Sequence, residues 1–127
     1  MTTNELKIRT KNFSLLIIDL AEKLPNTIAT RIIINQIIKA GTSVGANYRT
    51  VCRARSDREF VSKMNIVLEE SDEVLFWLEI ILEKNWIPKE EIEIAWKEGN
   101  ELTAIFVSSL KTVNSKINNL KNLNSKI

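Results

Sequence analysis

The sequence predicts an all-α protein folded as an up-down-up-down antiparallel four-helix bundle. Turn-forming residues are scarce, with 3 Gly and 2 Pro among 127 residues. Apolar residues recur at alternating spacings of three and four along four segments, which is the pattern of amphipathic helices. The connections between these segments are short, and short connections make neighbouring helices antiparallel. The length suits one domain with a core, so we predict a single bundle domain over residues 1–127.

The first helix is predicted over residues 9–24. Pro25 ends it, because a residue that precedes proline is pushed out of the α region. Asp19 and Lys23 are four residues apart and can pair on the exposed side. The apolar side consists of Phe13, Leu16, Ile17, Leu20 and Leu24.

The second helix is predicted over residues 27–54, with Asn26 or Thr27 capping its first free amides. Its apolar stripe consists of Ile34, Ile37, Gly41, Val44, Tyr48 and Val51. Gly41 and Gly45 lie inside the helix, where each glycine costs about 1 kcal/mol relative to alanine. We therefore expect a compensating contact there. It is either the close backbone of another helix, or a ligand or nucleic-acid backbone that lies against the glycines.

The third helix, over residues 57–84, has the clearest start. Ser56 and Glu59 match a capping box, in which the serine hydroxyl accepts from the glutamate amide and the glutamate carboxylate accepts from the serine amide. The main stripe consists of Phe60, Met64, Val67, Ser71, Val74, Leu78 and Ile81. A second stripe repeats every seven residues, at Val61, Leu68, Leu75 and Leu82. This wide apolar face predicts contact with more than one neighbouring helix.

The fourth helix is predicted over residues 88–122, after a loop at Asn85-Trp86-Ile87. Pro88 suits the first helical position, and Glu90 and Glu91 suit the positive end of the helix dipole. The apolar stripe consists of Ile92, Ala95, Gly99, Leu102, Phe106, Leu110, Val113, Ile117 and Leu120. The C-terminal tail is rich in Asn, Ser and Lys and is expected to fray.

Four large apolar residues fall outside the main stripes, namely Phe76, Trp77, Ile80 and Trp96. Either they cover the edges of the core or they form an interface with other copies of the chain. We favour self-association, because the apolar residues exceed what one small bundle hides.

The net charge of +2 hides a strong asymmetry along the chain. Residues 1–68 hold 11 basic and 5 acidic side chains, residues 69–101 hold 3 and 11, and residues 102–127 hold 4 and none. This distribution can steer an anionic partner to one end of the molecule, or bring the acidic face of one copy against the basic face of another. Charge alone leaves both possibilities open.

The connection between the second and third helices concentrates arginine. The candidate nucleic-acid-binding residues are Arg49, Arg53, Arg55, Arg58 and Lys63. Arginine binds phosphate oxygens in a bidentate manner, and each neutralised phosphate releases counterions. Lys111, Lys116, Lys121 and Lys126 would add diffuse attraction. On the residues alone, a solvated face, or salt bridges to the acidic third helix and the start of the fourth, is an equal alternative.

The composition argues against catalysis and against a metal or cofactor site. The chain has no histidine, which is the commonest general base and zinc ligand. No Gly-rich phosphate loop follows a strand, and no nucleophile has a base beside it. Glu69 and Glu73 share a helix face, and we interpret them as solvated or as ion-pair partners. We therefore predict no enzyme, no catalytic residues, no metal and no cofactor.

Cys52 is the single cysteine, so it cannot form an internal disulfide, and we predict a packed core thiol. No apolar run of signal-peptide type precedes it. The longest apolar runs have four residues, as in Leu15 to Ile18, whereas a bilayer span needs roughly 20. We expect a cytoplasmic protein with no membrane span.

Several motifs resemble one known family. They are Thr42-Ser43-Val44-Gly45-Ala46-Asn47-Tyr48-Arg49, Ser56, Glu59-Phe60, Lys63 and Trp77-Leu78-Glu79. They are similar to the four-helix bundle family of proteins encoded in intervening sequences of bacterial 23S ribosomal RNA genes. The resemblance runs from about Phe13 through the third helix, and the fourth helix matches mainly in pattern.

The resemblance implies a small, non-enzymatic, cytoplasmic bacterial bundle that assembles as a ring-shaped homopentamer. It also implies relatives that serve as accessory variability subunits of retroelement reverse transcriptases and contact nucleic acid through basic surfaces. Helix-packing or signature roles are expected at Gly41, Gly45, Asn47, Tyr48, Ser56, Glu59 and Phe60. Thr50 departs from the signature, which usually has an acid there. This makes the connection between the second and third helices, with Arg49, Arg53, Arg55 and Arg58, more positive, and we call this region the corner.

Two functions from different classes remain. The first is an RNA- or DNA-binding accessory protein that uses the arginine-rich corner, with a protein partner such as a reverse transcriptase. The second is an oligomeric protein-binding scaffold without nucleic-acid affinity, in which the corner pairs with the acidic third helix of another copy. The resemblance favours the first.

Overall fold

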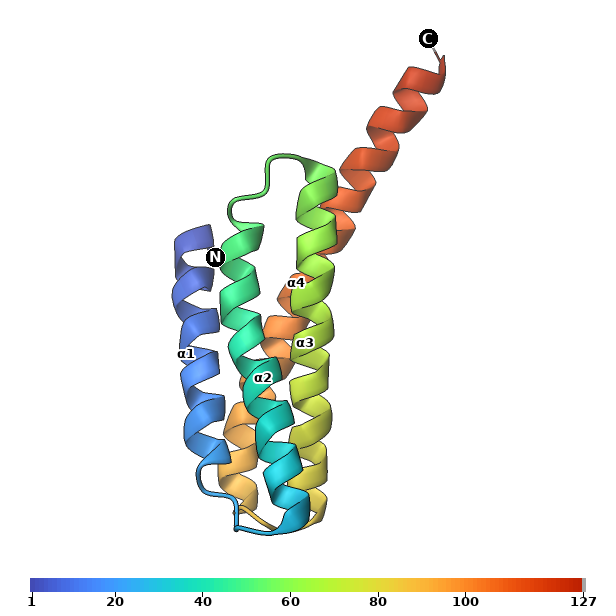
Figure 1. Ribbon diagram of the computed structural model, residues 1–127. Helices are drawn as coiled ribbons and strands as arrows, with labels where there is room; N and C mark the ends of the chain where they lie inside the picture. The colour runs from blue at the N-terminus through green and yellow to red at the C-terminus, as the bar shows by residue number, and fades with distance from the viewer. Residues whose placement is uncertain (127) are drawn as a thin grey trace.

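The computed structural model describes residues 1–126, and in this part of the chain four helices account for the fold, with no strand (Figure 1). The helices are α1 (Thr3–Ala21), α2 (Ile28–Val51), α3 (Asp57–Glu83) and α4 (Lys89–Lys126). Each helix packs on the next in antiparallel order, and α1 and α4 share the smallest contact. This confirms the predicted four-helix bundle. Ile127, the last residue of the predicted domain, lies outside the described residues.

The first helix begins earlier and ends earlier than the sequence analysis predicts. Thr2 and Glu5 form a capping box: the Thr2 hydroxyl accepts from the Glu5 amide at 3.1 Å, and the Glu5 carboxylate accepts from the Thr2 amide at 3.2 Å. These two bonds start α1 at Thr3 instead of residue 9. The helix ends at Ala21 instead of residue 24, because the chain tightens into a turn before Pro25.

The second helix starts after the Thr27 cap but ends at Val51, three residues before the predicted end at 54. The amides of Arg53 and Ala54 donate to carbonyls three residues back, at 3.1 and 3.0 Å. Such bonds are typical of a turn that terminates a helix. The arginines of the corner therefore belong partly to a helix end and partly to a loop.

The third helix begins after the Ser56 cap, whose hydroxyl accepts from the Glu59 amide at 3.1 Å. The return bond from the Ser56 amide to the Glu59 carboxylate, which a full capping box requires, is absent from the hydrogen bonds of residues 1–126. The cap is therefore half of the predicted motif. The helix ends at Glu83, one residue before the predicted end.

The fourth helix starts at Lys89, directly after Pro88, and continues to Lys126. It is helical beyond residue 122, where the sequence analysis predicts a frayed tail. Figure 1 shows that its last turns project past the end of the bundle. We call residues 111–126 the arm.

Most residues of the predicted stripes form the core, but the end of the fourth-helix stripe does not: Val113 and Ile117 are half-buried and Leu120 is 52% exposed, because these residues lie in the arm. Phe13 and Phe106 are the largest side chains that are fully buried. Ile34 and Phe60, at the ends of their stripes, are half-buried and pack against the core instead of lying within it. Of the four apolar residues outside the stripes, two pack against the core and two are exposed. The packed pair is Trp77 and Ile80, and the exposed pair is Phe76 and Trp96.

α1 packs closely against the two glycines of α2. A Cβ atom on Gly41 would lie 2.7 Å from Cγ2 of Ile17. One on Gly45 would lie 2.8 Å from the Ser14 hydroxyl and 3.2 Å from the backbone oxygen of Thr10. The Ser14 hydroxyl donates to the Gly41 carbonyl at 2.7 Å. The space in front of both glycines is thus filled by α1, and a ligand does not fit there.

Ion pairs connect α1 and α4, the adjacent helices that share the smallest contact. We call this face, between α1 and α4, the narrow side of the bundle. Arg9 donates to both carboxylate oxygens of Glu98, at 2.8 and 2.7 Å, and its Nη2 lies 3.0 Å from Glu101. The hydrogen bonds to Glu98 raise the pKa of Arg9 above its ordinary value. Lys23 pairs with Glu91 near the opposite end. These long-range pairs are absent from the sequence-based expectations.

We predict that Gly45→Ala destabilises the protein by roughly 1–3 kcal/mol, because the added methyl group would lie 2.8 Å from the Ser14 hydroxyl, which is held by its bond to the Gly41 carbonyl, and 3.2 Å from the Thr10 backbone oxygen. Helix propensity alone predicts the opposite sign, a gain of about 1 kcal/mol. Urea denaturation measures the free energy of unfolding. Ala46→Gly, at the adjacent exposed position, serves as the control and should cost about 1 kcal/mol from propensity alone. A stabilised Gly45→Ala variant would contradict the close approach.

Candidate nucleic-acid interface

The predicted corner lies at one end of the bundle, at the connection between α2 and α3. Arg49 is in the last turn of α2, Arg53 and Arg55 follow in the connection, and Arg58 is in the first turn of α3. All four arginines are exposed. Lys63 lies further along α3 and is half-buried. The structure therefore presents the arginines to solvent and holds the lysine closer to the bundle.

None of these five cations forms a salt bridge among residues 1–126. The side chains that do are Arg9, Lys23, Lys89 and Lys116. Pairing of the corner with the acidic third helix or the start of the fourth within one chain is thus not the arrangement found. The corner charges are left to solvent or to another molecule.

The arginines do not converge on one pocket. Arg55 lines a shallow pocket of about 360 Å³ together with Tyr48 and Cys52, whereas Arg58 lines a separate cleft against α4. Burial raises the pKa of the Tyr48 hydroxyl, and the neighbouring Cys52 adds to this. Cys52 is half-buried, packs against the core and lines the pocket, so the predicted packed thiol lies at the edge of the core and not inside it. It follows the last turn of α2, where the helix already leaves the core.

The arm adds a second set of cations to the same end. The C-terminal end of α2, the start of α3 and the end of α4 meet there, because successive helices alternate in direction (Figure 1). Residues 49–63 and 111–126, which we call the basic end, hold nine basic and two acidic side chains. Lys116 of the arm lies 3.4 Å from Asp57 and offsets one of these acids.

The opposite end of the bundle is acidic. Residues 79–93, around the connection from α3 to α4, hold five acidic and two basic side chains. The charge asymmetry along the sequence thus becomes an asymmetry along the bundle axis. In the sequence, the lysines of the arm form a set separate from the arginines of the corner. Their position beside the corner could have been inferred from an unbroken fourth helix combined with the alternating topology.

The remaining signature residues support packing. Tyr48 is buried and stacks on Phe106 with ring centroids 6.3 Å apart. The Asn47 amide donates to the Ser43 carbonyl at 2.9 Å within α2. Ser56 caps α3, and Phe60 packs against the core. These side chains hold the corner in place, and the guanidinium groups of the arginines are its exposed functional groups.

Two further properties concern the described part of the chain. Residues 1–126 contain no cluster of three or more His, Cys, Asp or Glu side chains arranged to hold a metal ion. No described helix is both long enough and apolar enough to cross a bilayer.

Comparison with known families supplies the identification. Residues 3–108 match the family model described as 23S rRNA-intervening sequence protein. The chain belongs to this family. A solved structure of a protein of unknown function from the S23 ribosomal protein family of Bacteroides thetaiotaomicron VPI-5482 is similar, with 31% identity and a TM-score of 0.77. The similarity covers 83% of this chain and 97% of that chain. Comparison with curated proteins gave no match.

The family assignment confirms the resemblance found in the sequence. Neither the family description nor the structural neighbour indicates a catalytic family. The matched region stops at residue 108, so the arm lies beyond the part that matches the 23S rRNA-intervening sequence family. The arginines of the corner lie inside the matched part, and the lysines of the arm lie outside it.

We predict that Arg53→Gln and Arg58→Gln change the free energy of unfolding by less than about 0.5 kcal/mol, because both side chains are exposed and unpaired within residues 1–126. Arg58 also lies at the positive end of α3, where a cation gains nothing from the helix dipole. Arg9→Gln is the contrasting variant and should cost about 1 kcal/mol. Urea denaturation of the three variants makes the comparison. A large loss at Arg53 or Arg58 would assign the corner a structural role.

Proposed function

We propose that this protein is a non-enzymatic, cytoplasmic accessory protein that binds nucleic acid through its basic end. The observation that supports this most is the exposure of four arginines at the corner, with no ion pair to any of them among residues 1–126. Exposed guanidinium groups without carboxylate partners are free to bind phosphate oxygens. The acidic residues gather at the other end of the bundle, so an anionic partner is attracted to one end only.

The strength of such binding depends on salt. Each neutralised phosphate contributes a slope of about −0.9 in a plot of log affinity against log salt for duplex DNA. Three to five phosphate contacts therefore predict a loss of roughly 40- to 500-fold between about 50 and 200 mM salt. This dependence separates phosphate binding from apolar contact, which salt does not weaken in this way.

We predict that fluorescence anisotropy with a structured RNA and a duplex DNA shows binding that weakens steeply with salt. The double variant Arg49→Gln/Arg53→Gln should bind at least tenfold more weakly and with a shallower salt slope. Arg31→Gln, an exposed arginine near the acidic end, is the matched control and should bind like the wild type. Absence of binding at low salt would refute the proposed function and leave the protein-binding scaffold as the better account.

Self-association is part of the proposal, with the family resemblance pointing to a pentamer. The narrow side of the bundle offers an apolar surface for it. A groove of about 440 Å³ there includes Phe13, Leu16 and Ile94. Ile94 is 64% exposed, and Ile8 and Leu15 of α1 are exposed as well. Exposed apolar residues that gather in this way are typical of protein interfaces.

Assembly would also strengthen nucleic-acid binding. Several copies of a weak basic surface act together on one strand, because binding at one copy raises the effective concentration at the next. A reverse transcriptase or another protein that the assembly assists remains a proposal that the resemblance implies. The scaffold alternative draws on exposed Phe76 and Trp96, which lie on the acidic α3 and the first half of α4.

We predict that Ile94→Glu lowers the assembly state of the protein, because it replaces the most exposed apolar side chain of the groove with a charge. Sedimentation velocity measures the change. Ile28→Glu is the matched control: Ile28 is also an exposed isoleucine, but it lies at the start of α2, outside the groove. If both variants sediment like the wild type, this face is not the interface. If Arg49→Gln/Arg53→Gln dissociates the assembly instead, the corner pairs with acids of another copy.

A further inference from the structure

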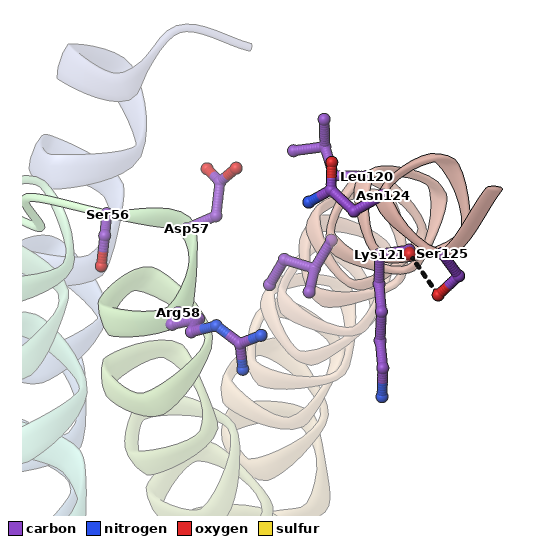
Figure 2. Close-up of a pocket in the computed structure, with 8 residues that line it drawn as sticks. Ser56, Asp57, Arg58, Leu120, Lys121, Asn124 and Ser125 are labelled. Atoms are coloured by element: carbon purple, nitrogen blue, oxygen red, sulfur yellow. Dashed lines mark hydrogen bonds between the residues drawn. The ribbon is translucent and has the colours of Figure 1, made fainter. Parts of the chain in front are cut away.

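The arm and the start of α3 enclose a cleft that the proposed function does not yet use. Its volume is about 510 Å³. Arg58 contributes from α3, and Ile117, Leu120, Lys121 and Asn124 contribute from the arm. Figure 2 shows Arg58 extending from α3 toward the arm, with Lys121 and Asn124 on the helix opposite. The cleft is formed by two segments about 60 residues apart in the sequence.

The charge in the cleft is positive. Arg58 and Lys121 bring one cation from each wall. Asp57 also lines the cleft, but Lys116 lies 3.4 Å from its carboxylate and compensates its charge. Neither Arg58 nor Lys121 forms an ion pair within residues 1–126. A phosphate group between the two walls would satisfy both cations.

The cleft is also apolar, and this property restricts the type of nucleic acid. Ile117 is half-buried and Leu120 is 52% exposed, so the arm wall offers hydrocarbon surface beside Lys121. A duplex presents phosphates and sugars on its outside and keeps its base faces stacked inside. A single strand has base faces free to lie against protein side chains. The combination of cations and hydrocarbon therefore suits a single strand.

We infer that this cleft binds single-stranded nucleic acid, with phosphates on Arg58 and Lys121 and a base against Ile117 and Leu120. The side-chain amide of Asn124 both donates and accepts, so it can hydrogen-bond a base edge. The inference rests on the proposed function and adds to it the class of strand that is bound. It also assigns a role to the arm, which lies beyond the matched family region.

The composition of the arm is consistent with a segment that a ligand holds in place. Five of the sixteen residues from 111 to 126 are Asn, and Asn has a low helix propensity. Past Leu110 no arm side chain is buried, so packing adds little to the stability of this part of α4. A strand in the cleft contacts both α3 and the arm. It would thereby fix the arm against the bundle.

The test uses the full-length protein and fluorescence anisotropy with four probes. The probes are an RNA strand and a DNA strand of the same unpaired sequence, and the two corresponding duplexes. The chain offers matched pairs of variants within the arm. Leu120→Ser alters the cleft and Leu123→Ser does not, although the two leucines are 52% and 56% exposed. Lys121→Gln alters the cleft, and Lys126→Gln is its control.

The wild type is expected to bind the single strands more tightly than the duplexes. Leu120→Ser should weaken single-strand binding roughly fivefold and leave duplex binding unchanged, because only the strand offers a base face. Lys121→Gln should weaken strand binding and reduce the salt slope by about one contact. Leu123→Ser should behave like the wild type, and Lys126→Gln should weaken strand and duplex binding alike and only slightly, because Lys126 contributes diffuse attraction and does not line the cleft. Binding of either the RNA or the DNA strand in this pattern supports the inference.

Other patterns overturn it. If Leu120→Ser and Leu123→Ser act alike, or if duplexes bind more tightly than strands, the cleft is not a single-strand site. In that case a loss of affinity in Arg49→Gln/Arg53→Gln still supports the proposed function, so the two failures are distinguishable. If the wild type binds none of the four probes, the proposed function fails and the cleft inference fails with it. Circular dichroism confirms that each variant keeps its helix content.

Discussion

The close approach of α1 and α2 at Gly41 and Gly45 is the constraint on which the rest of the structure depends. A side chain at either glycine would meet atoms of α1, and the Ser14 hydroxyl joins the two helices by donating to the Gly41 carbonyl. This contact fixes the register of α2 against α1. Because the corner follows within a few turns of the same helix, the register also fixes where Arg49 and Arg53 leave the bundle. The positions of the exposed charges thus follow from a buried contact.

The opposite property holds on the side where α1 meets α4. There the helix backbones lie close together over a smaller area than in the other adjacent pairs, and the pairs formed by Arg9 with Glu98 and Lys23 with Glu91 join them. Partly exposed ion pairs stabilise a protein much less than buried apolar area does. The interface between α1 and α4 is therefore the least stabilising of the interfaces between adjacent helices in one copy. Leu16 and exposed Ile94 line the groove on the same side. This apolar surface is the reason why we propose that a second copy of the chain packs there.

The alternating topology separates charge along the bundle axis. Basic residues cluster in the connection of α2 to α3 and in the arm, and acidic residues cluster around the connection of α3 to α4. In an antiparallel bundle these connections lie at opposite ends (Figure 1). The two charged regions are too far apart to neutralise each other within one chain. The basic end therefore keeps a positive electrostatic potential that can attract an anionic partner. Between the two ends, the buried residues are apolar apart from a few serine and threonine side chains.

The sequence alone determined the helices, most of their buried faces and the arginine corner, because helical periodicity, caps and charge clusters are local properties. Ser56 as a cap and the stripe ending at Val51 are examples. It missed the Thr2 cap, and the packed Cys52 thiol lies at the edge of the core because the helix ends one residue earlier.

Only the tertiary structure decided which distant residues meet. The pairing of Arg9 with Glu98 and the cleft between Arg58 and Lys121 depend on the register of helices that are far apart in the chain. No local pattern encodes that register. It results from how the buried side chains of four helices fit together, with the glycines of α2 allowing α1 to pack closely.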